Sequence, residues 1–274
     1  MVQFAVQKAH TPMAMRSAVL LALASTAAST AGPASRPWLN AASPIRARVA
    51  SLLGQMTIEE KAGQLLHGSL GLDADAPAVV AAIKAGSMGA MTIEGQHPTN
   101  GSTCDAECRI GRLRTLQLAW INGTRLGIPL SFVIETSHCG AAGGTIFPMG
   151  ITQGASWNTT LAHVVGQAIA KEARAWGGDR GLSPEINVCT DPRFGRIEEN
   201  FGEDPAHVTA FTTAAVTGLQ GGNTSAGDYL PDDEHIVCEA KHCCAYGAGG
   251  RDGQSADMSP KTLHDIYLRS WDAV

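Results

Sequence analysis

The run from Ile128 to Ile134, Ile-Pro-Leu-Ser-Phe-Val-Ile, constrains the fold most strongly because it is almost continuously apolar. A strand with one solvated face alternates apolar and polar residues. An uninterrupted apolar strand is instead buried on both faces, as in a parallel sheet covered by helices. Helical patterns precede this run at residues 112–120 and follow it at residues 161–176. The sequence therefore predicts an α/β fold with parallel strands.

The alternation of strand, loop and helix continues along the chain. Further strands are predicted at residues 88–93, 186–189 and 236–240, and further helices begin after Thr57, Asp204 and Ser259. The last helix, Pro260 to Val274, is expected to turn Leu263, Ile266, Tyr267 and Trp271 inward. Parallel strands joined through helices need right-handed crossovers, and both a barrel and a doubly wound sheet satisfy that requirement.

Local signals mark where several helices begin and end. Thr57-x-x-Glu60 is a capping box, and Leu65 and Leu66 are expected on the apolar side of its helix. Asp204-Pro205 has the form of an N-cap followed by proline at the first helical position. The pairs Gly177-Gly178 and Gly221-Gly222 end the helices that precede them.

The fifteen residues from Asp191 to Pro205 hold two arginines, five carboxylates, two prolines and two glycines. Charged residues make up 16% of the whole chain, so this segment is strongly enriched in charge. Proline restricts φ and glycine admits φ values closed to other residues. The segment is therefore predicted to be a shaped polar loop and not a simple solvated run of charges.

Polar residues follow the predicted strands at their C-terminal ends, where α/β folds place their sites. The candidates are Glu135, Thr136 and His138, then Asp191, Arg193, Arg196, Glu198 and Glu199, then Lys241 and His242. A hydroxyl group both donates and accepts hydrogen bonds, so a pocket of mixed carboxylates and cations suits a neutral ligand with many hydroxyls.

The overall charge excludes some classes of partner. The formal net charge is −5 and no basic stripe is present, so nucleic acid is not an expected partner. A phosphate-binding barrel is disfavoured because no glycine-rich loop precedes a Lys-Ser or Lys-Thr pair. The apolar stretch near the N-terminus is too short to span a bilayer.

Residues 1–31 are predicted to be a signal peptide. Lys8 and Arg16 precede an apolar stretch beginning at Ser17, and small residues around Ala28 and Ala31 offer a cleavage site. A disordered apolar N-terminus is the alternative. Four of the seven asparagines lie in glycosylation sequons, namely Asn100, Asn122, Asn158 and Asn223. Secretion to the extracellular space with N-glycosylation is therefore expected, although Asn158 also suits a helix cap.

Seven cysteines leave at least one unpaired if the others form disulfides. In an exported protein, Cys104 and Cys108 could close a small surface loop. A zinc site built from Cys104, Cys108, His242 and Cys243 lacks the ordered ligand spacing of known zinc motifs. Neither a metal nor a cofactor is expected.

From Met56 onward the chain resembles the N-terminal barrel of glycoside hydrolase family 3, the β-glucosidase and β-xylosidase family. The matching motifs are Met56-Thr57-x-x-Glu60-Lys61-x-x-Gln64-Leu65, Gly127-Ile128-Pro129, Glu135-x-x-His138, Thr145-Ile146-Phe147-Pro148, Ser183-Pro184, Asp191-Pro192-Arg193-Phe194-Gly195-Arg196, Glu199, Gly202-Glu203-Asp204-Pro205, Lys241-His242, Ala245-Tyr246-Gly247 and Gly250-Arg251.

The resemblance implies a fold, a ligand and a set of site residues. Residues 32–274 are expected to form a TIM-type (β/α)8 barrel, incomplete at the C-terminus. The implied ligand is a β-linked oligosaccharide or glycoside, whose terminal sugar would be bound by Glu135, Arg196, Lys241 and His242. In this comparison Asp191, Arg193 and Glu199 brace the loop, and Glu198 and Glu203 are structural.

A retaining glycosidase needs a carboxylate nucleophile and a carboxylic acid/base roughly 5 Å apart. By resemblance, the nucleophile comes from a Ser-Asp-Trp-like segment that would lie beyond Val274, and the acid/base comes from still later sequence. Asp272 belongs to a helix, whereas barrel chemistry sits at strand ends. The expectation is a fragment of a secreted retaining β-glycosidase that carries sugar-binding residues, has no catalytic pair and is inactive alone.

Two other functions stay open at this point. The chain could be a non-catalytic sugar-binding fragment that uses the same four residues. It could also be a β-N-acetylhexosaminidase, although those family members have a Pro-Gly-His-like stretch where this chain has Cys-Cys-Ala-Tyr-Gly. Cys139 and Cys243 depart from the usual family residues. A Cys139–His138 hydrolase is disfavoured because catalytic partners are not normally sequence neighbours.

Overall fold

The computed structural model describes residues 36–69, 81, 88–93, 106–140, 144–222, 232–250 and 255–274. The chain divides into two compact units. Unit 1 comprises Met1–Met91 with Cys104–Leu130, and unit 2 comprises Thr92–Thr103 with Ser131–Val274. The predicted leader, Cys104 and the sequons at Asn100 and Asn223 lie outside the described residues.

Unit 1 is mainly helical. Its elements are the 3₁₀-helix η1 (Pro37–Leu39), helices α2 (Ile45–Gln55), α3 (Ile58–Gln64) and α5 (Ala106–Gly123), strand β1 (His67–Ser69) and most of strand β2 (Ala90–Thr92). A small core joins Trp38, Met56 and Leu126, with the indole of Trp38 donating to the Leu126 carbonyl at 3.3 Å. Helix α5 confirms the helix predicted over residues 112–120.

The predicted capping box is present at the start of α3. The Thr57 hydroxyl accepts from the Glu60 amide at 3.2 Å, and the Glu60 carboxylate accepts from the Thr57 amide at 2.9 Å. The expectation for Leu65 and Leu66 was wrong. Helix α3 ends at Gln64, so both side chains lie past the helix and are exposed, Leu65 by 87%.

Unit 2 contains three neighbouring strands of the sheet. In unit 2, strands β3 (Ser131–Ile134), β4 (Arg180–Gly181) and β5 (Val237–Cys238) pair in parallel. Ile134 is in register with Gly181, and Gly181 with Cys238. The C-terminal ends of these strands therefore point the same way, and the α/β class with parallel strands is confirmed.

The strand predicted at residues 186–189 is absent. Ile186 and Val188 are buried as expected, but they make no strand ladder. The Ile186 amide donates to the Lys241 carbonyl at 2.9 Å, and the Cys189 amide donates to the Gly202 carbonyl in the polar loop at 3.0 Å. The backbone hydrogen bonds of this segment therefore go to two different partners, and only a single bridge between Glu185 and Lys241 remains.

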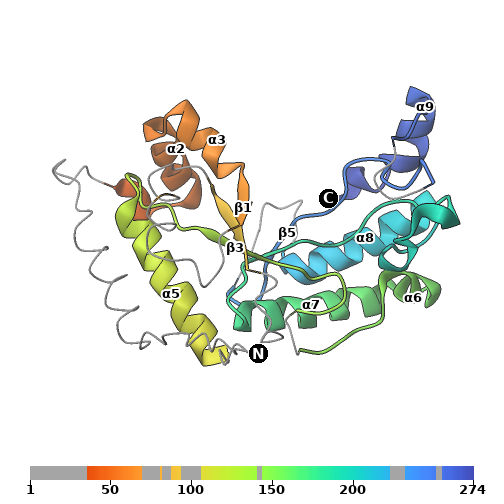
Figure 1. The fold of residues 1–274 in the computed structure, drawn as a ribbon, viewed down its shortest axis with the longest axis horizontal. Helices are drawn as coiled ribbons and strands as arrows, with labels where there is room; N and C mark the ends of the chain where they lie inside the picture. The colour runs from red at the N-terminus through yellow and green to blue at the C-terminus, as the bar shows by residue number, and fades with distance from the viewer. Residues whose placement is uncertain are drawn as a thin grey trace, which may run out of the picture. The chain divides into compact units, whose positions relative to one another are not determined.

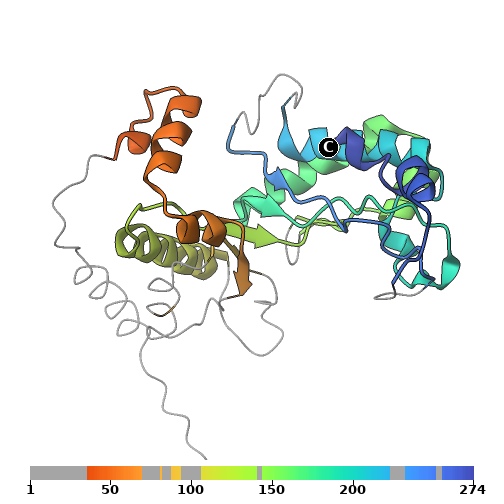
Figure 2. The ribbon, with the colours of Figure 1, turned by 90° about the horizontal axis from the view of Figure 1, so that it is seen from above.

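Helices α7 (Thr159–Ala175) and α8 (Pro205–Gln220) lie side by side in unit 2; α8 lies above α7 in Figure 1 and over it in the view from above in Figure 2. Glycine makes the close approach possible. A Cβ added at Gly218 would lie 2.2 Å from the His163 carbonyl oxygen, and one at Gly166 would lie 2.9 Å from that of Ala215. A short helix, α6 (Gly150–Ala155), precedes α7.

The ends of α7 and α8 follow the sequence signals. Asn158 caps α7 by accepting from the Leu161 amide at 3.1 Å, and Asp204 caps α8 by accepting from the His207 amide at 2.8 Å. Gly221 ends α8 with a left-handed φ of 73°. The buried face of α7 centres on Val165 and Ile169, whereas Leu161 and Val164 are exposed.

The predicted helix from Pro260 to Val274 is broken into three pieces. These are α9 (Pro260–Thr262), a π-helical turn η6 (Leu263–Tyr267) and a 3₁₀-turn η7 (Trp271–Ala273). The inward-facing residues of η6 are confirmed, since Leu263 and Ile266 pack on the core of unit 2 and Tyr267 is buried in it. The Tyr267 and Thr190 hydroxyls are 2.9 Å apart, which ties this segment to the start of the polar loop.

Candidate functional site

A cluster of carboxylates and cations lies in unit 2, where segments leave the C-terminal ends of the parallel strands. Glu135 follows β3, Glu185 follows β4, and Lys241 and His242 follow β5. We call this set the charged cluster; its members are Glu135, Glu185, Arg196, Glu199, Lys241 and His242. All four sequence-predicted binding residues belong to it.

Glu135 is held at the end of β3 by its own turn. Its Oε1 accepts from the Thr136 amide at 2.9 Å, the Ser137 amide at 3.1 Å and the Ser137 hydroxyl at 2.8 Å. The other oxygen, Oε2, accepts from Lys241 Nζ at 2.7 Å. With 39% of its side chain exposed, this carboxylate is fixed in direction and still open to a ligand.

Glu185 is the buried centre of the cluster, with only 2% of its side chain exposed. Its Oε1 lies 3.1 Å from Lys241 Nζ and 3.4 Å from Arg196 Nη2. Its Oε2 lies 2.9 Å from His242 Nδ1, but the ring nitrogen makes no aligned hydrogen bond, so this is a close polar approach.

Sequence reasoning did not identify Glu185. Ser183-Pro184, directly before it, belongs to the motifs that the chain shares with the family, whereas Glu185 does not. A carboxylate placed directly before the buried Ile186 was the available signal, because an ionisable group at such a position needs a partner.

Arg196 joins the polar loop to the cluster. Its guanidinium binds both oxygens of Glu199, with Nε to Oε1 and Nη2 to Oε2 each at 2.6 Å. Its Nη1 lies 3.5 Å from His242 Nε2 and from the Tyr246 hydroxyl. Glu199 thus braces Arg196, in the role expected of it.

The rest of the loop is braced by Asp191 and Arg193. The Asp191 carboxylate accepts from the Arg193 amide at 2.9 Å and from its guanidinium Nη2 at 2.5 Å, and the guanidinium holds the pKa of Asp191 down at about 2. Glu198 and Glu203, which were expected to be structural, are exposed.

Burial and pairing set the charges in the cluster. Burial raises the pKa of Glu185 to about 7, against the opposing effect of Lys241. Burial alone would lower the pKa of Lys241, but Glu135 and Glu185 outweigh it and raise the pKa. The hydrogen bond from Arg196 lowers the pKa of Glu199. Burial, with Arg196 and Lys241 nearby, lowers the pKa of His242, which favours the neutral form of its ring.

The segment after Glu185 fixes the backbone next to the cations. Asn187 Nδ2 donates to the His242 carbonyl at 2.9 Å, and the His242 amide donates to Asn187 Oδ1 at 3.1 Å. The His242 and Tyr246 rings lie 4.6 Å apart. His242 is therefore held at both its backbone and its ring, with about a third of its side chain exposed.

Among the described residues, the cysteines that bear on a metal site are Cys108, Cys243 and Cys244. Cys108 is in a disulfide, so its thiolate is not available to the zinc site considered from the sequence. Cys243 and Cys244 are exposed and carry no disulfide. Within the described ranges, no group of three or more His, Cys, Asp and Glu side chains is arranged to hold a metal ion.

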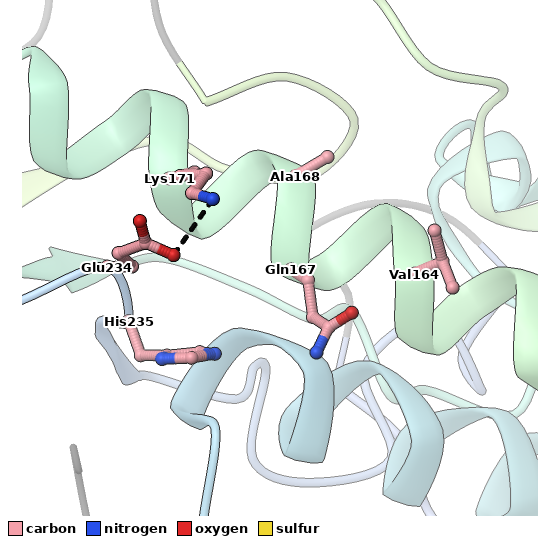
Figure 3. Close-up of a pocket in the computed structure, with 6 residues that line it drawn as sticks. All are labelled: Val164, Gln167, Ala168, Lys171, Glu234 and His235. Atoms are coloured by element: carbon pink, nitrogen blue, oxygen red, sulfur yellow. Dashed lines mark ion pairs between the residues drawn. The ribbon is translucent and has the colours of Figure 1, made fainter. Parts of the chain in front are cut away.

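A pocket elsewhere in unit 2 is separate from the charged cluster. It lies between α7 and the segment before β5, and Figure 3 shows the residues that line it, Val164, Gln167, Ala168, Lys171, Glu234 and His235. Lys171 and Glu234 form an ion pair of 2.8 Å across it. This pocket shares no residue with the charged cluster.

The cluster offers charged donors and acceptors side by side in a partly open setting. Lys241 and Arg196 donate, Glu135 accepts, and the neutral His242 ring can do either. Such a set binds neutral hydroxyl groups through charge-assisted hydrogen bonds.

For the part of the chain that the structure describes, no helix combines the length and apolar character needed to cross a membrane.

The chain is similar to known proteins over most of its length. The family model described as glycosyl hydrolase family 3 N terminal domain matches residues 57–273. A putative beta-xylosidase of Formosa agariphila is 34% identical over 246 residues, which covers 85% of this chain and 31% of that protein. A periplasmic beta-glucosidase of Salmonella typhimurium is 31% identical over 229 residues, covering 82% of this chain and 27% of that protein.

A solved structure shows the same fold. The beta-glucosidase of Listeria innocua in complex with glucose superposes with a TM-score of 0.65 at 29% identity. The superposition covers 83% of this chain and 31% of the other. The chain therefore spans between about a quarter and a third of the length of these three relatives.

Proposed function

The chain matches the N-terminal domain of glycosyl hydrolase family 3 and belongs to that family, and on that basis we propose that it supplies the sugar-recognition residues of a retaining β-glycosidase. The enzyme would remove terminal β-D-glucosyl or β-D-xylosyl residues in carbohydrate breakdown. The observation that supports this most directly is the position of Lys241 Nζ, 2.7 Å from Glu135 and 3.1 Å from Glu185.

Each predicted binding residue has a form suited to a sugar hydroxyl. Glu135 keeps its carboxylate partly exposed, and the proposal assigns it to two hydroxyls of the terminal sugar. Arg196, Lys241 and His242 would bind the remaining hydroxyls. These three side chains are partly buried and already aligned by their partners, so little side-chain entropy is lost when a sugar binds.

The proposed role of the cluster is recognition and not bond cleavage. Each of its carboxylates has a cation within ion-pairing distance: Glu135 and Glu185 contact Lys241, and Glu199 contacts Arg196. A glycosidase nucleophile attacks the anomeric carbon, and its partner donates a proton to the leaving group. We therefore propose that the 274-residue chain binds the sugar without hydrolysing the glycosidic bond.

Calorimetric titration of the full 274-residue chain with D-glucose and D-xylose tests the binding role. Glu135→Gln should weaken the affinity for the sugar about tenfold or more, because a hydrogen bond to a charged group is lost. Glu234→Gln is the matched control, since it removes a carboxylate from an exposed ion pair away from the cluster. Absence of binding by the folded chain, or equal affinity in Glu135→Gln, would contradict the proposal.

A hydrolysis assay on aryl β-glucosides and β-xylosides tests the catalytic statement. The chain should show no turnover above the uncatalysed rate. Turnover that a single substitution within the chain abolishes would show instead that the chain holds its own nucleophile. N-acetyl-D-glucosamine as a third titrant would reveal a β-N-acetylhexosaminidase by binding more tightly than glucose.

We also propose that the protein is secreted and N-glycosylated. Asn122 and Asn158 are both exposed. Asn158 uses Oδ1 to cap α7, whereas a glycan attaches to the other atom of the amide, so the cap and a glycan are compatible. Expression in a eukaryotic secretory host followed by enzymatic deglycosylation should reduce the apparent mass. Retention of the protein inside the cell would contradict the proposal.

A further inference from the structure

Glu185 contacts three of the four residues assigned to sugar binding. Its carboxylate lies 3.1 Å from Lys241, 3.4 Å from Arg196 and 2.9 Å from His242. These partners come from two separate segments, the polar loop and the turn after β5. One buried side chain therefore links the two segments that carry the cations.

The other two carboxylates of the cluster have narrower roles. The side chain of Glu135 pairs with Lys241, and that of Glu199 pairs with Arg196. Glu135 is open enough to meet a ligand, whereas the side chain of Glu185 is almost fully enclosed. Glu185 thus acts on a ligand through other residues and not by direct contact.

The backbone around Glu185 strengthens the same link. The Ile186 amide donates to the Lys241 carbonyl at 2.9 Å, and the Lys241 amide donates to the Pro184 carbonyl at 3.1 Å. Asn187, two residues after Glu185, binds the backbone of His242 on both its amide and its carbonyl. The segment 184–187 therefore holds the backbone of both Lys241 and His242, and the Glu185 carboxylate contacts the side chains of both.

We propose that Glu185 is the positioning residue of the sugar-binding site, with its buried carboxylate holding Lys241, Arg196 and His242 in the arrangement that meets the sugar hydroxyls. This inference rests on the proposed function of the cluster. It adds a residue that does not touch the sugar and on which the geometry of three binding residues depends.

The charge state of Glu185 offers a readout that a purely structural residue lacks. The groups facing it are Glu135, Arg196, Glu199, Lys241 and His242. Burial raises the pKa of Glu185 to about 7, while the pKa of Lys241 is raised and those of Glu199 and His242 are lowered. Glu185 therefore changes charge near neutral pH, whereas the pKa values of Lys241 and Glu199 are shifted away from neutral pH.

The direction of the pH effect follows from this. Above pH 7 the ionised Glu185 carboxylate attracts Lys241 and Arg196. As the pH falls through 7 the carboxylate takes up a proton and the two cations lose their shared counter-charge. Sugar binding by the wild-type chain should therefore weaken between pH 8 and pH 6.

Titration of D-glucose into the wild-type chain and Glu185→Gln at pH 8 and pH 6 tests the proposal. Wild-type affinity should fall severalfold at pH 6. Glu185→Gln should bind about tenfold more weakly than wild type at pH 8 and show little change at pH 6, because a charged hydrogen-bond partner is lost. Glu185→Asp, which keeps the charge on a shorter side chain, should recover part of the affinity.

Glu234→Gln is the control and should follow the wild-type curve. The proposal would be overturned if Glu185→Gln bound D-glucose at pH 8 as tightly as wild type does. It would also be overturned if the affinity of Glu185→Gln fell between pH 8 and pH 6 as much as that of wild type. If Glu135→Gln lost sugar binding while Glu185→Gln kept it, the sugar site would be upheld and the role of Glu185 rejected. Circular dichroism establishes that each variant is folded, and Glu185→Asp serves if Glu185→Gln does not fold.

A second measurement does not depend on sugar binding. A small amine-reactive ester acylates Lys241 at pH 8, and peptide mass spectrometry follows the rate. This rate reports how strongly the neighbouring carboxylates stabilise the charged form of the Lys241 amine. Lys241 should react severalfold faster in Glu185→Gln, since the lost carboxylate favours the charged amine. An unchanged rate would overturn the positioning role, whereas failure of wild type to bind any sugar would reject the proposed function alone.

Discussion

Lys241 and Glu185 are joined twice, once through the backbone and once through their side chains. The two residues form an isolated parallel bridge, and Lys241 Nζ lies 3.1 Å from Glu185 Oε1. This double link places the ammonium group within 2.7 Å of Glu135 at the end of a different strand. The pair therefore connects the ends of three parallel strands at one point.

Lys241→Met should destabilise the fold as well as abolish sugar binding. The substitution keeps most of the side-chain volume but leaves the buried Glu185 carboxylate without its main counter-charge. Breaking one side of a buried ion pair costs about 3 kcal/mol of unfolding free energy. Urea unfolding measures this loss. Lys171→Met removes a cation from an exposed pair and should cost less than about 1 kcal/mol.

Arg196→Lys should weaken sugar binding about tenfold although the charge is kept, because an ammonium cannot reproduce the two-point bond to Glu199. Calorimetric titration with D-glucose gives the change. Arg193→Lys is the control, since Arg193 is largely exposed and lies outside the cluster. Equal loss in both variants would mean that the loop as a whole, and not the Arg196 fork, determines binding.

Gly218→Ala should destabilise unit 2 by about 1–3 kcal/mol, because the new methyl group would meet the His163 carbonyl at 2.2 Å and force α7 and α8 apart. Gly111→Ala is a matched control in a helix where no neighbour lies within 4 Å of the added methyl group. That control should be neutral or gain up to about 1 kcal/mol from helix propensity. Chemical denaturation of both variants distinguishes steric clash from propensity.

Asp204→Ala should cost about 1 kcal/mol of stability, since the first turn of α8 loses the side chain that accepts from the His207 amide. Glu203→Ala changes an adjacent exposed carboxylate and should leave the unfolding midpoint unchanged. Thermal unfolding of the two variants makes the comparison. A similar loss of stability in Asp204→Ala and Glu203→Ala would show that the effect comes from local charge and not from the helix cap.

The stability of the wild-type chain should depend on pH through Glu185. Its pKa is about 7 in the folded state and near its ordinary value of 4.5 when unfolded, so the folded state binds this proton more tightly. Stability from this group should therefore rise as pH falls from 7 to 4.5 and level off below. The full effect is on the order of 3 kcal/mol at 1.36 kcal/mol per pKa unit.

The comparison with Glu185→Gln isolates that contribution. The difference in unfolding free energy between wild type and variant should shift in favour of wild type as the pH is lowered over this window. A constant difference from pH 7 to 4.5 would show that the Glu185 pKa is ordinary in the folded protein.

Some parts of the fold could be predicted because they depend on neighbours in the sequence. The cap at Asp204, the end of α8 at Gly221 and the capping box at Thr57 each involve groups within a few residues of one another. The apolar run ending at Ile134 also predicted a buried parallel strand correctly. In these cases a local pattern contains the whole physical cause.

Other expectations failed because burial does not specify a hydrogen-bond partner. Ile186 and Val188 are as buried as any strand residue, yet their segment pairs with Lys241 and then with the polar loop. Leu65 was predicted on an apolar helix face, but α3 ends one residue earlier. Apolar composition indicated an interior segment at 186–189, and the path of distant segments decided its conformation.

The sequence by itself determined the α/β class, the helix caps and the identity of the four candidate binding residues, because local spacing and family motifs carry that information. Only the tertiary structure decided that Glu185 stands at the centre of the site. Its importance depends on the meeting of segments near residues 135, 185, 196 and 241, which are far apart in the chain. A buried charge is defined by its surroundings, and those surroundings exist only in the folded protein.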